Sequence, residues 1–190
     1  MTTAPHSSEL NNSFSRRHFL KTSAAAGTLL FPGLSLLGQE TPPAEKKRPK
    51  VAVVYTAFAH RWHAHVLLEN FLAPYLFNGQ LTDPGVDMVS FYADQRPEGD
   101  MTDETSKKFG IQVYKTISDA LCLGGNELAV DAVLSIGEHG SYHTNERGQV
   151  MYPRKRFFDE IVAVMKRSNR FVPVFNDQHL SYRWDWAKGM

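Results

Sequence analysis

The chain has 190 residues, which suits one domain with an extension. Its contents of 42% hydrophobic and 22% charged residues are ordinary for a globular protein. The formal net charge of +1 gives no support for a nucleic-acid partner, because proteins that bind nucleic acids usually carry a strongly basic face. Cys122 is the only cysteine, so the sequence excludes an intramolecular disulfide and a cysteine-based zinc cluster.

Residues 1–40 have the parts of a signal peptide. The string Ser15–Lys21 (SRRHFLK) matches the twin-arginine consensus at every defined position, and a moderately apolar stretch follows it. That stretch is about sixteen residues long and contains Gly and Pro, so it is short for a stable membrane span. Residues 41–49 are rich in proline and basic side chains, which predicts a solvated linker. We therefore expect the twin-arginine machinery to export this chain to the periplasm or another extracytoplasmic space.

Residues 50–180 predict one α/β domain. Lys50–Thr56 is a β-branched run typical of a strand buried on both faces. Residues 62–77 carry apolar side chains at helical spacing, with Pro74 expected to kink or shorten the helix, and Val86–Ala93 predicts a second strand.

The second half of this domain continues the alternation. In chain order it predicts a polar helix over 102–110, an extended piece at 113–114, a helix over 119–123 capped by Ser118, a strand over 130–136, a helix over 153–168 and a strand over 171–175. In the helix over 153–168, Arg154 and Lys155 are expected on the face opposite the apolar stripe. Strands that alternate with helices indicate a Rossmann-like three-layer fold with a mostly parallel sheet, whose ligands bind at the carboxyl ends of the strands.

Histidines and carboxylates follow three of the predicted strands. Imidazole and carboxylate groups bind zinc, iron or manganese, and they equally orient a sugar or act as acid and base. One hypothesis is a metal-assisted hydrolase or lyase; another is a non-catalytic binding protein for a sugar-like solute. The candidate metal ligands are His60, His63, Glu138, His139, His143, Asp177 and His179.

Four segments resemble, in order and spacing, the cofactor domain of the glucose–fructose oxidoreductase / inositol dehydrogenase (Gfo/Idh/MocA) family. They are VDMVSFYAD, DETSKKFGIQVYKTISDAL, VDAVLSIG and RKRFFDEIVAVMKRSNRFVPVF. The resemblance covers residues 50–178 and implies NAD or NADP as cofactor. It also implies a second, substrate-binding domain, through which oligomers could form. Residues 181–190 are expected to be the start of a segment leading to that domain, which is otherwise absent from this sequence. The implied cofactor contacts are Thr56, Ala57, Phe58, His60, Asp94, Ser135, Gly137, Glu138 and His139.

Two positions depart from the family pattern. Residues 56–63 replace the Gly-rich turn, and Phe58 and Trp62 crowd the approach to a pyrophosphate there. Asn176–Gln178 replaces the catalytic Glu-Lys-Pro, so no lysine stands at that position as proton donor. The expectation is an exported, oxidoreductase-related protein that acts on or binds a carbohydrate-like small molecule.

Overall fold

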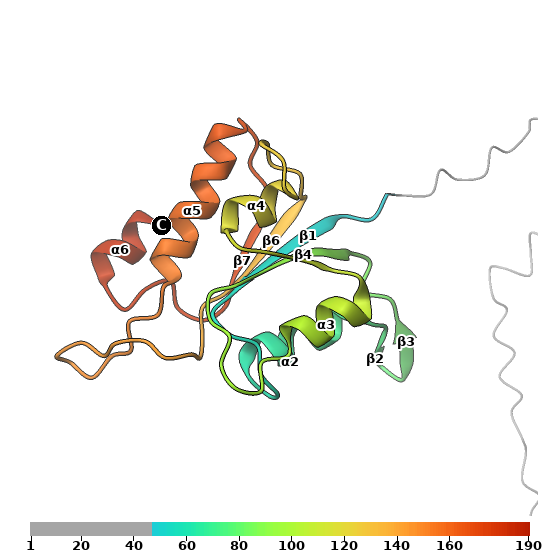
Figure 1. Ribbon diagram of the computed structural model, residues 1–190, viewed down its shortest axis with the longest axis horizontal. Helices are drawn as coiled ribbons and strands as arrows, with labels where there is room; N and C mark the ends of the chain where they lie inside the picture. The colour runs from blue at the N-terminus through green and yellow to red at the C-terminus, as the bar shows by residue number, and fades with distance from the viewer. Residues whose placement is uncertain (1–46) are drawn as a thin grey trace, which may run out of the picture. The chain divides into compact units, whose positions relative to one another are not determined.

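The computed structural model describes residues 47–190, which are coloured in Figure 1. The predicted signal peptide over 1–40 and most of the predicted linker over 41–49 lie outside the described residues. The described residues comprise the α/β domain and the residues that follow it.

A parallel sheet forms the centre of this domain. Its strands, in sheet order, are β5 (Gln112–Tyr114), β4 (Asp87–Ala93), β1 (Lys50–Tyr55), β6 (Ala132–Ile136) and β7 (Val174–Asn176). Every neighbouring pair runs parallel. The chain starts in the middle strand, winds to one edge and then to the other, which is the Rossmann order with its switch point between β1 and β6. The predicted fold class is confirmed.

Strand β1 is central because both of its faces are apolar. Residues 51–55 are almost completely buried, and Val53 pairs with Phe91 of β4 and Leu134 of β6. Alternate side chains point to opposite faces of a strand, so Val53 and Tyr55 belong to one core and Ala52 and Val54 to the other. This double burial is what the continuous β-branched run predicted.

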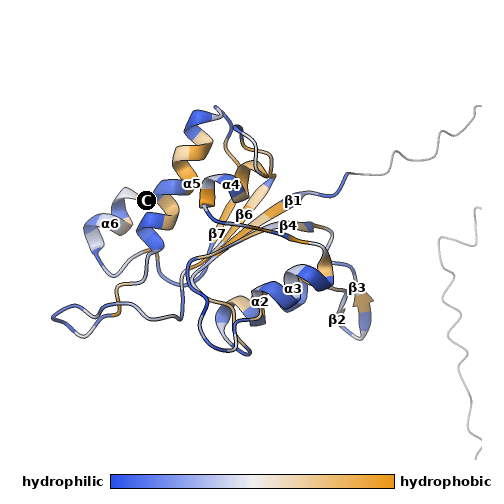
Figure 2. Cartoon of the chain, viewed as in Figure 1, coloured by the Kyte–Doolittle hydropathy of each residue, from blue (hydrophilic) through white to orange (hydrophobic). Residues whose placement is uncertain are grey.

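Helices cover both faces of the sheet. On one side lie α2 (His63–Leu72) and α3 (Thr102–Phe109), and on the other α4 (Ile117–Cys122) and α5 (Arg154–Arg167) (Figure 1). A last short helix, α6, spans Trp184–Gly189. Figure 2 shows apolar strands between helices that are polar on their outer sides. Each large apolar side chain buried in this way contributes about 1.5–3 kcal/mol to folding.

The predicted helix over 62–77 was too long. Helix α2 ends at Leu72, and residues 75–77 and 80–82 instead form the antiparallel strands β2 (Tyr75–Phe77) and β3 (Gln80–Thr82). Pro74 has no amide hydrogen and forces the preceding residue into extended backbone, which stops the helix. Asn78 and Gly79 then adopt φ of 49° and 75°, the left-handed pair that a two-residue hairpin turn requires.

Several other boundaries differ from the sequence prediction, and two of the differences have a clear physical cause. Helix α4 is capped by Thr116, whose hydroxyl accepts a hydrogen bond from the Asp119 amide at 3.0 Å, and not by Ser118. The last strand covers 174–176 and not 171–175, because Pro173 has no amide hydrogen for the sheet. Helix α3 ends as predicted at Gly110, which has φ of 68°.

Candidate functional site

Thr56 joins the carboxyl ends of three strands. Its amide donates to the Ile136 carbonyl at 3.1 Å, and its carbonyl accepts from the Gln95 amide at 2.8 Å. Its hydroxyl donates to the Glu138 carbonyl. Every polar group of this buried residue is thus bonded within the protein, so Thr56 fixes the ends of β1, β4 and β6 relative to one another.

A crevice of about 630 Å³ opens beside this junction. It is built from the start of α2, the loop after β4 and the loop after β6, so it lies at the switch point where ligands of such sheets bind. We call it the carboxyl-edge crevice. Its lining consists of Trp62, Gln95, Arg96, Pro97, His139, Gly140, Ser141 and Tyr152.

One wall of the crevice is aromatic. The Trp62 indole stacks on the His139 imidazole, with ring centroids 4.9 Å apart and planes 11° apart, and the His63 ring meets His139 edge-on at 5.0 Å. Burial lowers the pKa of His139, and the neighbouring His63 lowers it further. His139 is therefore a neutral imidazole at neutral pH.

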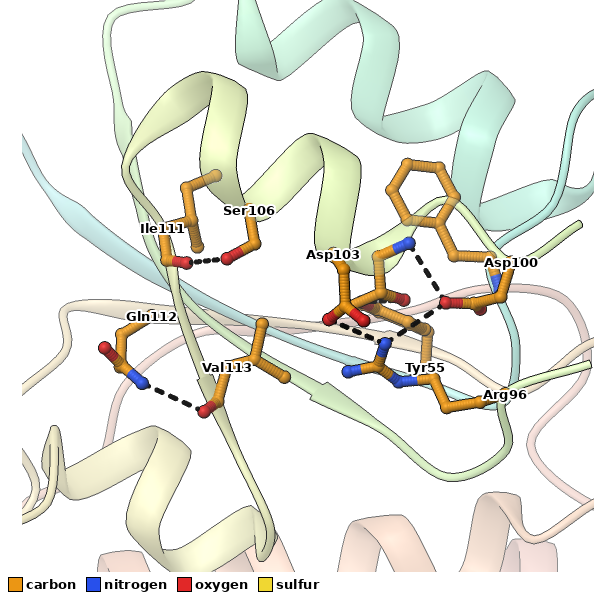
Figure 3. A network of polar contacts seen from close by, with 10 residues as sticks. Tyr55, Arg96, Asp100, Asp103, Ser106, Ile111, Gln112 and Val113 are labelled. Atoms are coloured by element: carbon orange, nitrogen blue, oxygen red, sulfur yellow. Dashed lines mark hydrogen bonds and ion pairs between the residues drawn. The ribbon is translucent and has the colours of Figure 1, made fainter.

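Another part of the lining is polar and fixed by its own hydrogen bonds. The Gln95 amide group donates to the Ser141 carbonyl at 2.9 Å and accepts from the Ser141 amide at 2.8 Å. The neighbouring Gly140 has φ of 95°, and a Cβ on this residue would lie 2.9 Å from Gln95 Oε1. Figure 3 shows the Arg96 guanidinium beside two carboxylates, Asp103 at 2.9 Å and Asp100 at 3.4 Å.

A buried arginine joins the loops after β6 and β7. Arg154, the first residue of α5, is 1% exposed, forms an ion pair with Glu138 and donates to Nε2 of His179 at 2.9 Å. Its guanidinium also lies over the Tyr152 ring at 5.1 Å. Burial lowers the pKa of Arg154, although Glu138 acts in the opposite direction. Gly137 makes room for this side chain, since a Cβ there would lie 2.6 Å from Arg154 Cγ.

His63 forms a pair with Asp177. Its Nδ1 lies 2.7 Å from Asp177 Oδ2, and the amide of Asp177 donates to the Ser135 carbonyl at 2.9 Å. When Nδ1–H donates to the carboxylate, Nε2 of the same ring becomes the acceptor. The pair thereby fixes the orientation of the ring that meets His139 edge-on.

Asp94, at the end of β4, binds protein groups on three sides. It accepts from the hydroxyls of Tyr92 and Tyr142, each at 2.7 Å, and forms an ion pair with Arg156. Burial pushes the pKa of Asp94 upward, but the hydrogen bonds from Tyr142, Tyr92 and Arg156 outweigh it and lower the pKa overall. The carboxylate thus fastens the loop after β6 to the end of β4.

We expect Asp94→Asn to lower the free energy of unfolding by about 1–2 kcal/mol at neutral pH, because a charged acceptor of three donors is lost. The folded pKa of Asp94 lies below its unfolded value, so this stabilisation is complete above the unfolded pKa, about 3.9, and disappears as the pH falls through the folded pKa. Urea unfolding at pH 7, 5 and 3 measures the effect. Asp103→Asn, at a side chain 85% exposed, is the control. A loss at pH 3 equal to that at pH 7 would contradict this account.

The structure brings together five of the seven histidines and carboxylates proposed as metal ligands. His63, Glu138, His139, Asp177 and His179 meet around Arg154. His60 instead pairs with His65, ring centroids 5.0 Å apart, and His143 is exposed on the loop after β6. Within residues 47–190, no three His, Cys, Asp or Glu side chains are arranged to hold a metal ion.

Three of the residues expected to contact a nucleotide, Ala57, Phe58 and Ser135, are buried in the domain. The Phe58 ring packs edge-on against Tyr55 and Phe91. The Phe58 amide donates to Asp100 at 3.3 Å. The first loop thus has no glycine turn, and Asp94 after β4 is bonded to Tyr92, Tyr142 and Arg156.

Comparison with known proteins bears on the N-terminal segment. Residues 13–32 match the model of the twin-arginine translocation pathway signal sequence. The protein is exported through this pathway. No curated protein and no solved structure matches the chain. In the part of the exported protein that the structure describes, none of the helices has the length and apolar character needed to cross a membrane.

Sequence reasoning missed several residues of this site. Gln95, Arg96 and Tyr152 carry no motif, and Arg154 was expected on the exposed face of its helix, which is wrong. One signal was available for Arg154. A cation in the first turn of a helix is mildly unfavourable, which favours a carboxylate partner, although Lys155 and Arg156 share this turn.

Proposed function

We propose that this exported α/β protein binds a carbohydrate-like small molecule in the carboxyl-edge crevice. The observation that carries the proposal is the lining itself, which places the aromatic rings of Trp62 and Tyr152 beside the hydrogen-bonding groups of Gln95 and Arg96. The C–H face of a sugar ring packs on an aromatic side chain, and its hydroxyls bond to amide and guanidinium groups.

The size and build of the crevice support a small ligand. Its volume of about 630 Å³ falls within the usual range of small-molecule sites, roughly 300–1,000 Å³. The polar part of the lining is held by the protein's own hydrogen bonds, so its polar groups are already oriented. A pre-oriented polar wall favours specific binding because little side-chain freedom is lost.

A nicotinamide-dependent oxidoreductase is the second candidate. The strand order β5-β4-β1-β6-β7 favours it, since sheets of this order bind dinucleotides at the β1/β6 switch point. The buried Phe58 and the triply bonded Asp94 weigh against it, because both occupy positions that a dinucleotide needs. Sugar binding therefore fits the crevice better than nicotinamide binding.

Trp62→Ala tests the proposal. A sugar that binds only the folded protein stabilises it and so raises the midpoint of thermal unfolding. At a concentration about one hundred times its Kd, the sugar adds about 2.7 kcal/mol to the free energy of unfolding. We expect at least one neutral aldose to raise the midpoint of the wild-type chain in a thermal-shift titration. The aldoses to be titrated are glucose, galactose, mannose, xylose and arabinose. The shift should be lost in Trp62→Ala and kept in Trp184→Ala, a control at a residue 81% exposed and outside the crevice.

Parallel titrations with NAD(H), NADP(H) and divalent metal ions separate the candidates. If a nicotinamide nucleotide raises the unfolding midpoint and no sugar does, the oxidoreductase becomes the first candidate and sugar binding the second. Absence of a shift with every aldose would overturn the proposal. If a sugar raises the midpoint of Trp62→Ala as much as that of the wild-type chain, the sugar binds outside the crevice.

A further inference from the structure

We propose that the carboxyl-edge crevice opens and recloses the ring of a cyclic hemiacetal sugar, with His139 as general base and Tyr152 as general acid. This inference rests on the proposed function, because it names the chemistry done on the bound sugar. It starts from the acid–base groups of the lining. The crevice holds one imidazole, from His139, and one phenol, from Tyr152.

The lining narrows the possible reactions. Glycoside hydrolysis needs two carboxyl groups beside the scissile bond. None of the described residues that line the crevice is Asp or Glu. Ring opening of a hemiacetal needs only one base and one acid, and neither a cofactor nor a covalent intermediate. The lining therefore matches ring opening better than hydrolysis.

His139 is prepared as the base by its surroundings. Its ring is fixed between Trp62, stacked at 4.9 Å, and the edge of His63 at 5.0 Å. The backbone at His139 has φ of 67°, so the residue occupies a left-handed conformation that its packing maintains. A positive charge on His139 would be poorly solvated in this setting, which keeps the ring neutral and able to accept a proton.

Tyr152 is held as the acid by two neighbours. Its ring meets Tyr142 edge-on at 5.6 Å, and the Arg154 guanidinium lies over it at 5.1 Å. This cation–π contact holds the Tyr152 ring in place beside the crevice. Arg154 also forms the ion pair with Glu138, the residue before His139. One buried cation thus positions both acid–base groups, and Arg154 is a positioning residue.

The step balances without another reactant. His139 takes the proton of the anomeric hydroxyl, and the O–H electron pair forms the carbonyl at C1. The bond from C1 to the ring oxygen breaks, and that oxygen takes the proton of Tyr152. Reclosure on either face of the aldehyde returns each proton to its donor and interconverts the α and β anomers.

The test measures anomer interconversion by the full chain, followed by polarimetry and proton NMR, for the aldose that gives the largest thermal shift. Asn tolerates φ near +60°, so His139→Asn removes the imidazole without straining the backbone. Tyr152→Phe keeps the ring and removes the proton. We expect each variant to reduce the acceleration over buffer at least 100-fold, a usual share for one acid or base. His143→Asn, at an exposed histidine of the same loop, should keep the wild-type rate.

The pH profile is a second readout. The pKa of His139 is lowered by burial and by His63 from α2, while Glu138 beside it and Asp177 after β7 act in the opposite direction. The acceleration should therefore persist below pH 6.5 and fall as His139 becomes protonated.

The outcomes separate this inference from the proposed function. A sugar that shifts the midpoint but interconverts at the buffer rate would refute the catalytic inference and leave sugar binding intact. A wild-type rate in His139→Asn or Tyr152→Phe would also refute it. If none of the aldoses binds, the proposed function fails and the inference fails with it.

Discussion

Replacing Arg154 by Met is expected to lower the free energy of unfolding by about 3 kcal/mol, because removing one partner of a buried ion pair leaves the other charge uncompensated. Arg154 is 1% exposed and its partner Glu138 has a side chain 16% exposed, so water cannot fully replace the guanidinium. His179 loses its hydrogen-bond donor in the same substitution. For a domain of this size the midpoint of thermal unfolding should fall by roughly 10 °C.

Lys155→Met is the matched control for this prediction. Lys155 is the next residue of α5 and pairs with Asp159 at the surface, and such helical surface pairs contribute about 0.3–0.5 kcal/mol. Urea unfolding followed by circular dichroism compares the two variants. The double variant Arg154→Met with Glu138→Gln removes both charges and should recover part of the loss. Equal losses in Arg154→Met and Lys155→Met would contradict the buried-pair account.

Adding one methyl group at Gly137 is expected to cost about 2–3 kcal/mol, the upper part of the range for overpacking a core. The new Cβ would lie 2.6 Å from Arg154 Cγ, which is too close for two carbon atoms. Arg154 cannot swing away, because its guanidinium is bound to Glu138 and His179. The strain must therefore move either α5 or the end of β6.

Two comparisons test the Gly137→Ala prediction. Gly189→Ala places a Cβ where no other atom lies within 4 Å and should leave the midpoint of thermal unfolding nearly unchanged. In an Arg154→Ala background the added methyl group has no Cγ to meet, so Gly137→Ala should then cost much less. A cost that stays the same in both backgrounds would place the clash elsewhere.

The sheet could be predicted from the sequence because its strands are locally distinct. A continuous β-branched run predicted β1, and the amphipathic pattern of residues 153–168 predicted α5, since both signals depend only on neighbouring residues. The hairpin of β2 and β3 was missed because its apolar residues also fit helical spacing, although Pro74 and the Asn78-Gly79 pair favoured a turn.

The candidate site was predictable only in outline. Parallel strands end at one edge of the sheet, so the sequence correctly placed His63, His139 and His179 on that edge. It could not show which of the edge residues meet, because that depends on how the loops after β6 and β7 fold back. His60 does not contact the other edge histidines, because its ring packs against His65, a contact that sequence spacing does not reveal.

The loop after β6 also has a kinetic consequence. Gln95 holds it through Ser141, and Asp94 holds it through Tyr142, before any ligand is present. A loop fastened at two points has few alternative positions, so ligand entry requires no ordering of a disordered segment. Binding should therefore follow a single exponential whose rate constant rises linearly with ligand concentration, without the plateau that a slow closing step would impose.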